Sequence, residues 1–291
     1  MHEYYNYLVC GDRKKHYLNY FREKYVSYPL NILSLGCGNG HLERLLINMF
    51  NYPYHSITGI DINPELVKFA KEEALKLGLQ NVHYIEADFN KINLPVKEFD
   101  LVIFFHSLHH VEKIEELLRQ VQRTLTSDGL LLVVDFVGPS RFQWNEKQFN
   151  LASELLEILP DELRIDLRRQ LQHDIKLSID RKSIDDIIAS DPSEAVRSSE
   201  TMNLLKNNFI VLEQKPHGGT LLNLLFDGIA GNFDETDQNV RTIILLLQKL
   251  EEILIREGII SSDFVFTVLK NKVIVKDLTP QYTGVYGSKL L

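Results

Sequence analysis

Apolar and polar positions alternate between two periods from residue 30 to residue 137. Short apolar segments predict strands, and between them apolar residues recur at the spacing of one helix face. The predicted strands cover residues 30–35, 56–61, 82–86, 99–105 and 130–136, and the predicted helices cover residues 41–49, 64–77 and roughly 111–125. This alternation is typical of a parallel sheet whose strands are joined by helices.

The alternation stops after residue 137. From there to about residue 190 the pattern is helical, with no strand between the helices. The residues Asp-Pro-Ser-Glu at positions 191–194 form the pattern of a capping box, so we expect a helix to begin there. A sixth and a seventh strand are predicted at residues 209–213 and 263–269, separated by a mainly helical stretch.

Composition and charge narrow the class of protein. The 291 residues are 44% hydrophobic and 25% charged, a composition typical of a folded chain rather than a disordered or fibrous one. The net charge of −8 disfavours nucleic acid as a partner, because phosphate backbones attract basic surfaces. Cys10 and Cys37 are the only cysteines, which excludes a disulfide framework and a zinc cage.

Two further patterns bear on the location of the chain. The first residues place their basic side chains after a short mixed stretch, which is the reverse of a secretory signal peptide. No apolar run approaches the ~20 residues that a membrane-spanning helix needs. We therefore expect a cytoplasmic protein that does not act on a membrane.

The strongest chemical signal is a glycine loop between the first predicted strand and the helix after it. Gly36, Gly38 and Gly40 allow the backbone to turn sharply and to approach a ligand closely, and the helix that follows offers unpaired N–H groups. Asp61 ends the next strand, 21 residues beyond Gly40, where a carboxylate can accept both hydroxyls of a ribose. These features predict a nucleotide-like ligand at the carboxyl edge of the sheet.

A second acidic residue, Asp88, follows the third strand and can accept the amino group of an adenine, with Phe89 beside the ring. The dinucleotide fingerprint requires a third glycine where this chain has His41, so a nicotinamide-dependent oxidoreductase is the less favoured alternative. Two carboxylates also suit a positively charged ligand without phosphate better than they suit a pyrophosphate.

Several segments resemble motifs of class I S-adenosylmethionine-dependent methyltransferases, namely LSLGCGNGHLE, the strand that ends at Asp61, EADF and FDLVIFFHSLHHV. The resemblance implies that the cofactor is S-adenosylmethionine. It implies cofactor contacts from these residues: Gly36, Cys37, Gly38, Gly40, Asp61, Ile62, Asp88, Phe89 and, near the methyl group, His106. The segment from Asp135 to Trp144 resembles a bacterial subgroup that acts on small molecules or glycans.

The resemblance also implies a fold and a domain organisation. The fold would be α/β: a Rossmann-like, doubly wound sheet of seven mostly parallel strands, with an antiparallel last strand and a helical insertion after strand five. Residues 30–137 and 195–275 would form the core and residues 138–194 a substrate cap. Residues 1–29 would form an aromatic lid segment and residues 276–291 a tail.

Histidines after the fourth strand are candidates for catalysis. An acceptor hydroxyl must lose its proton, and His106 or His109 is our predicted general base. Three histidines within five residues also suggest a metal site. No carboxylate–histidine ligand set accompanies them in the sequence, however, so we expect no metal. We interpret Cys37 as a small packed residue rather than as a nucleophile.

Four residues are candidates for binding the acceptor. Arg141 and Trp144 follow strand five, and His217 follows strand six next to two glycines, all at the carboxyl edge. Tyr5 belongs to a group of N-terminal tyrosines that can cover the site. The predicted function is methyl transfer to a small-molecule, glycan or peptide acceptor, and a non-catalytic module that retains the cofactor pocket is the alternative from another class.

Overall fold

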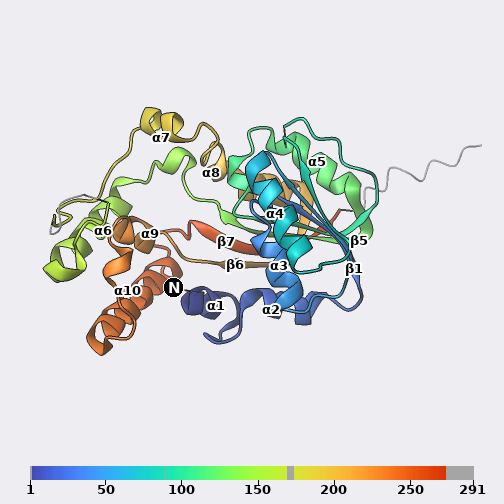
Figure 1. The fold of residues 1–291 in the computed structure, drawn as a ribbon. Helices are drawn as coiled ribbons and strands as arrows, with labels where there is room; N and C mark the ends of the chain where they lie inside the picture. The colour runs from blue at the N-terminus through green and yellow to red at the C-terminus, as the bar shows by residue number, and fades with distance from the viewer. Residues whose placement is uncertain (1, 89, 169–173, 273–291) are drawn as a thin grey trace, which may run out of the picture.

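The centre of the molecule is a seven-stranded sheet with the order β3-β2-β1-β4-β5-β7-β6 (Figure 1). The computed structural model describes residues 2–88, 90–168 and 174–272. The strands are β1 Leu30–Leu35, β2 Tyr54–Asp61, β3 Val82–Glu86, β4 Phe99–Phe105, β5 Leu125–Phe136, β6 Phe209–Pro216 and β7 Phe264–Asn271. The predicted tail from residue 276 and Phe89 lie outside the described residues.

Pairing of the strands confirms the predicted mostly parallel sheet. Strands β1 to β5 pair in parallel, and β7 runs antiparallel to both β5 and β6. Leu35 at the end of β1 is aligned with Ile60 on one side and with Phe104 on the other. The carboxyl ends of the parallel strands therefore meet at one edge, where residues distant in the sequence become neighbours.

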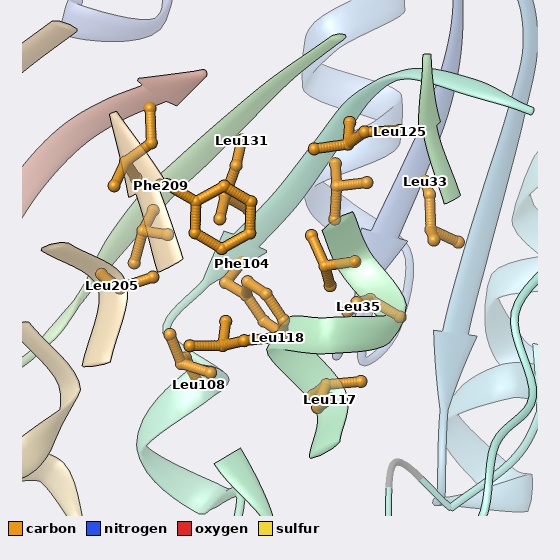
Figure 2. Packing of buried hydrophobic residues seen from close by; sticks show 14 of the residues in the cluster. Leu33, Leu35, Phe104, Leu108, Leu117, Leu118, Leu125, Leu131, Leu205 and Phe209 are labelled. Atoms are coloured by element: carbon orange, nitrogen blue, oxygen red, sulfur yellow. The ribbon is translucent and has the colours of Figure 1, made fainter. Parts of the chain in front are cut away.

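Helices cover both faces of the sheet because successive strand residues point to opposite sides. Figure 2 shows one face, where leucines such as Leu33 and Leu131 pack with Leu117 and Leu118 of α5 and Leu205 of α8. On the other face, neighbouring strand residues such as Ile32 pack against α2 and α3. These helices are α2 Tyr17–Tyr25, α3 His41–Asn48, α5 Ile114–Thr124 and α8 Ser198–Asn208, and α4 Pro64–Lys76 packs on β2 and β3.

A second group of helices lies beyond the carboxyl edge, on the left of Figure 1. It contains α1 His2–Cys10, α6 Glu146–Ile158, α7 Ile184–Ser190, α9 Leu221–Phe226 and α10 Gln238–Arg256. Buried residues of α1, α6, α9 and α10 form one hydrophobic cluster that includes Tyr4, Phe149, Leu225 and Leu247. The insertion after β5 and the helices between β6 and β7 therefore pack as one unit, which we call the helical cap.

Some element boundaries differ from the predicted ones. Helix α5 begins at Ile114 rather than at residue 111, because Leu108–His110 forms a separate 3₁₀ turn. Strand β5 begins at Leu125 rather than at residue 130, because Leu125 pairs with Phe99 before the register shifts.

The prediction that a helix begins at residues 191–194 is wrong. These residues form a turn, and α8 begins only at Ser198. Asp191 does accept the N–H and hydroxyl of Ser193, as a helix cap would. The Glu194 side chain, however, points to His109 instead of back to the backbone, and Ala195 adopts a positive φ of 47°. A long-range contact therefore replaces the local capping box.

Among the residues that the structure describes, no helix combines the length and the apolar character needed to span a membrane.

Candidate functional site

The glycine loop forms a tight turn between β1 and α3. Gly36, Gly38 and Gly40 have φ values of 81°, 52° and 73°, in the left-handed region that side chains disfavour. A Cβ atom on Gly40 would lie 2.6 Å from the hydroxyl oxygen of Tyr84, so this position also excludes a side chain sterically. A Cβ atom on Gly38 would meet no other atom within 4 Å, so the backbone at that position is open to a ligand.

Asp61 holds the glycine loop against the end of β2. One oxygen of its carboxylate accepts the N–H of Gly38 at 2.8 Å, and the other accepts the N–H of Asn63 at 2.9 Å. The next side chain, Ile62, is 62% exposed and adds an apolar surface beside the carboxylate. The structure thus brings together Asp61, Ile62 and the glycine loop, as the sequence predicted.

Asp88 lies at the end of the next strand in the sheet. Its carboxylate accepts hydrogen bonds from the backbone and side chain of Asn90 and contacts Lys91 at 3.0 Å. The backbone hydrogen bond from Asn90 and the charge of Lys91 lower the pKa of Asp88, so this residue is an anion at neutral pH.

Two buried groups that can lose a proton lie in the glycine loop and in the helix after it, namely the thiol of Cys37 and the carboxylate of Glu43. Burial raises the pKa of the Cys37 thiol, and nearby Glu43 raises it further, which leaves the thiol protonated and supports the packed role predicted for Cys37. Glu43 is fully buried, and burial raises its pKa to about 7. Neither of its carboxylate oxygens has a hydrogen-bond partner within the described part of the chain.

His106 directly follows β4 and adopts a positive φ of 55°, which is uncommon for a residue with a side chain. Its backbone N–H donates to Val134 on β5, and its exposed ring lies 5.8 Å from that of Phe264. Desolvation by the surrounding protein lowers the pKa of His106, so the ring is neutral at pH 7. A neutral imidazole open to solvent can accept a proton.

The buried carboxylate of Asp135 holds the turn that presents His106. It accepts the backbone N–H groups of Ser107 and Leu108 at 2.9 and 2.7 Å, and it lies 2.5 Å from Nδ1 of His109. Burial alone would raise the pKa of Asp135, but these partners lower it below its usual value. Asp135 was not among the residues predicted for the site, although an aspartate directly after the apolar run of a strand is a recognisable signal.

His109 lies between two carboxylates. Its Nδ1 contacts Asp135, and its Nε2 lies 3.4 Å from Oε1 of Glu194. Burial alone would lower its pKa, but the two carboxylates outweigh this effect and raise the pKa to about 9. His109 is therefore a cation with both nitrogens occupied, and the predicted role of general base does not fit this geometry.

His109, His110 and Glu194 also form the group of side chains that could hold a metal ion, since one ligand atom from each lies within 4.8 Å of the others. The sequence indicated no such ligand set, because Glu194 is far from the histidines in the chain. In this structure His109 uses both nitrogens for carboxylates, and Nδ1 of His110 lies 3.0 Å from the hydroxyl of Ser193. The histidines are thus satisfied by protein groups.

Arg141 and Trp144 lie where the chain leaves β5 for the helical cap. Arg141 donates from Nη1 to the carbonyl of Glu194 at 2.9 Å, so it holds residues 194–195 against this turn. Trp144 donates from Nε1 to Asp263 at 2.6 Å and stacks on Phe142. Burial raises the pKa of Asp263 to about 7.

His217 and Tyr5 are in contact, as expected for residues on the same side of the edge. Their ring centroids are 4.8 Å apart, and Tyr17 packs edge-on against His217 at 5.0 Å. His217 is 2% exposed, and its Nε2 has no hydrogen-bond partner among the described residues. Burial lowers its pKa to about 3, and the ring is therefore neutral.

Glu251 of α10 organises the loop that carries His217. Its buried carboxylate accepts the backbone N–H groups of Gly219, Leu221 and Leu222, as well as the hydroxyl of Tyr4. Glu251 was not predicted from the sequence, because an acidic residue in a long helix is usually exposed. Its helical spacing from Leu247 and Leu254, which are buried, is the signal that places it on the inner face.

The comparisons with known proteins agree on one family. A sequence profile described as a methyltransferase domain matches residues 29–213. The chain is 33% identical over 110 residues to a ubiquinone/menaquinone biosynthesis C-methyltransferase of Pseudomonas syringae pv. syringae, an alignment that covers 38% of this chain and 43% of that relative. It is 28% identical over 108 residues to an uncharacterized methyltransferase of Bacillus subtilis, which covers 37% of this chain and 41% of the relative. The match spans less than half the length of these curated relatives.

Solved structures are similar in fold. A phosphoethanolamine N-methyltransferase from Haemonchus contortus, bound to S-adenosyl-L-methionine, superposes with a TM-score of 0.53 over 88% of this chain and 51% of that one, at 15% identity. The [4+2]-cyclase SpnF superposes with a TM-score of 0.50 over 88% of this chain and 81% of that one, at 14% identity.

Proposed function

Because the chain belongs to the S-adenosylmethionine-dependent methyltransferases, we propose that it transfers a methyl group to a small-molecule, glycan or peptide acceptor at the carboxyl edge of its sheet. The observation that carries this proposal is the convergence of the glycine loop, Asp61 and His106 at that edge. Three consecutive neighbours in the sheet supply them, namely β2, β1 and β4.

The residues at this edge fit S-adenosylmethionine. The glycine loop leaves no room for a side chain at Gly40, and Asp61 lies against it with a carboxylate suited to two ribose hydroxyls. Asp88, Phe89 and Ile62 would bind the adenine, and the backbone of Gly36, Cys37 and Gly38 would face the methionine part. The cofactor supplies an electrophilic methyl group on a positively charged sulfur, and the two carboxylates favour this charge.

His106 is our proposed general base. Its ring is exposed and neutral, and it has no hydrogen-bond partner in the described part of the chain. For a hydroxyl acceptor, His106 would take the proton as the new bond to carbon forms. Asp135 and His109 would act as positioning residues, because they hold the turn on which His106 is carried.

The acceptor would approach from the helical cap. Arg141 and Trp144 belong to the chain that leaves β5, and Tyr5 contacts His217, which follows β6. Apart from Arg141, these candidates present aromatic or neutral groups. Positioning by such groups supplies much of the acceleration in a direct displacement, because the reacting atoms must be in line.

Calorimetry with S-adenosylmethionine tests the cofactor site. We expect binding by the unchanged chain and a loss of at least tenfold in affinity for Asp61→Ala, because two ribose hydrogen bonds are lost. Asp128→Ala is the matched control, since this aspartate is 81% exposed and pairs with Lys270 away from the edge. Unchanged affinity in Asp61→Ala, or binding of NADH in place of S-adenosylmethionine, would contradict the proposal.

A methylation assay tests the proposed base. Radiolabelled S-adenosylmethionine is incubated with small-molecule and macromolecular fractions of a cell extract, and His106→Ala is compared with the unchanged chain. We expect the rate to fall by roughly 10²–10⁴. His55→Ala is the control, because this histidine is exposed at the opposite end of β2. Equal rates for the two variants would show that no proton is taken by His106.

A further inference from the structure

The helical cap contains a cavity of about 210 Å³ next to the chain that leaves β5. The segment 142–149 forms one wall, α9 forms another, and the segment 179–182 closes it. Its apolar lining comes from Phe142, Trp144, Phe149, Ile179 and Leu224. We propose that this cavity binds a planar group of one or two rings in the methyl acceptor, an inference that rests on the proposed function.

The shape of the cavity favours a flat group. Phe142 and Trp144 are stacked, with an angle of 8° between the rings and 5.3 Å between their centroids. Phe149 stands at 88° to Trp144 and forms the adjoining wall. Aromatic rings attract one another in stacked and edge-on arrangements. An apolar cavity of about 150 Å³ can bind benzene, so 210 Å³ has room for one ring with a substituent or for two fused rings.

The aromatic wall is held in place by other side chains of the protein. Trp144 cannot rotate freely, because its Nε1–H donates at 2.6 Å to Asp263, which is 2% exposed. Phe149 is held from the other side by the guanidinium of Arg181, 4.0 Å above its ring. Binding therefore requires little ordering of side chains, which lowers its entropic cost.

Polar groups at the mouth indicate the chemistry of the ring substituent. Asp180 and Asp227 both accept hydrogen bonds from Arg168, so this guanidinium partly offsets their charges. Lys182 has no carboxylate partner among the described residues, and Asn223 is exposed beside it. A ring that carries an anionic or hydrogen-bond-accepting oxygen would pair with these two side chains.

The cavity is connected to the methyl-transfer edge by aromatic rings. Phe142 lies 4.9 Å from Phe136, Phe136 lies 5.3 Å from Phe264, and Phe264 lies 5.8 Å from His106. This row places the wall of the cavity and His106 at the two ends of one packed aromatic cluster, and an acceptor anchored in the cavity by its ring would extend from there toward His106. The proposed group is therefore a recognition element distant from the methylated atom.

Calorimetry with 4-nitrobenzoate, a planar carboxylate, tests the inference on the full chain. We expect it to bind at least tenfold more tightly than cyclohexanecarboxylate, which has the same charge but is not planar. Trp144 is the only tryptophan in the sequence, so quenching of its fluorescence by the nitro group reports that binding occurs at this cavity.

Two surface variants keep the test independent of folding. Asn223→Phe fills the mouth and should abolish binding, whereas Lys182→Gln should weaken it by on the order of tenfold because the charge-assisted hydrogen bond is lost. Lys206→Gln, an exposed lysine of α8, should change nothing. Equal binding of the two carboxylates, no quenching, or full binding in Asn223→Phe would overturn the inference. None of these measurements requires methyl transfer, so a negative result here would leave the proposed function unaffected. A negative result with Asp61→Ala would contradict the proposed cofactor site but would not change what these measurements say about the cavity.

Discussion

At the level of single residues, the turn after β4 shows how a strained position is maintained. His106 adopts a positive φ, which costs free energy for a residue with a side chain. The cost is offset by the Asp135 carboxylate, which accepts the two backbone N–H groups that follow His106. A backbone strain supported in this way is typical of functional sites.

The pairing of His109 with two carboxylates predicts a pH dependence of stability. The pKa of His109 is raised to about 9 in the folded state, above the unfolded value of about 6.5. Its contribution to the free energy of unfolding is therefore complete below pH 6.5 and is lost as the pH rises through 9. We expect the free energy of unfolding of the unchanged chain to exceed that of His109→Gln by on the order of 2–3 kcal/mol at pH 6. At pH 9.5 this difference should be much smaller.

Urea unfolding at several pH values measures this difference. His55→Gln serves as the control, because His55 is exposed and lies away from the carboxylates. A difference between the unchanged chain and His109→Gln that stays constant from pH 6 to pH 9.5 would refute the ionised pair.

At the level of elements, one carboxylate joins three segments that belong to different parts of the chain. Glu251 of α10 accepts N–H groups from the loop before α9 and from the first turn of α9, and it binds Tyr4 of α1. The first N–H groups of a helix have no partner within the helix, so Glu251 caps α9 from a neighbouring element. It also holds the loop that carries His217.

Replacing Glu251 should therefore destabilise the helical cap more than an ordinary surface change. We expect Glu251→Ala to lower the free energy of unfolding by about 3 kcal/mol, because three backbone N–H groups lose their acceptor in a buried place. Glu251→Gln keeps one acceptor oxygen and should cost less. Thermal and urea unfolding measure both values.

Glu257→Ala is the matched control, because this glutamate follows the same helix and its side chain is 56% exposed. A cost for Glu251→Ala no larger than that of the control would mean that the cap does not depend on this carboxylate.

At the level of the whole molecule, the ligand edge lies between two bodies of structure, the sheet with its covering helices and the helical cap (Figure 1). The contacts of Glu194 with His109 and of Trp144 with Asp263 cross this boundary. A ligand bound between the two parts should stabilise the folded chain as a unit.

We therefore expect S-adenosylmethionine to raise the thermal unfolding midpoint of the chain. At one hundred times its dissociation constant, a ligand that binds only the folded state adds about 2.7 kcal/mol. Differential scanning fluorimetry over a concentration series checks this dependence, and Asp61→Ala should show a clearly smaller shift at the same concentrations because its affinity is lower. A midpoint that does not move with cofactor concentration in the unchanged chain would argue against binding at the edge.

The sheet and the cofactor edge could be predicted because their signals are local. The strand periods, the glycine loop and Asp61 each lie within short segments, and parallel pairing brings strand ends to a common edge. The seven mostly parallel strands and the antiparallel last strand followed from the resemblance and were confirmed. The roles assigned to the cofactor-contact, catalytic and acceptor-side residues, Asp61 and His106 included, stay predictions.

Local pattern was misleading where a side chain found a distant partner. Glu194 had the position of a capping residue, but its side chain instead contacts His109 in the turn after β4, and this half-buried ion pair replaces the cap. His109 in turn was predicted as a base, and two carboxylates from β5 and from the segment after α7 make it a cation instead.

The chain's own pattern thus decided its fold class, its glycine loop and the edge at which a nucleotide-like cofactor belongs. Tertiary packing alone decided which histidine is free, which acids are buried, and where the cap leaves a cavity. The physical reason is the distance along the chain over which each effect acts. Periodicity and turn chemistry depend on a few neighbouring residues, whereas a pKa or a cavity depends on atoms that folding brings together from the whole chain.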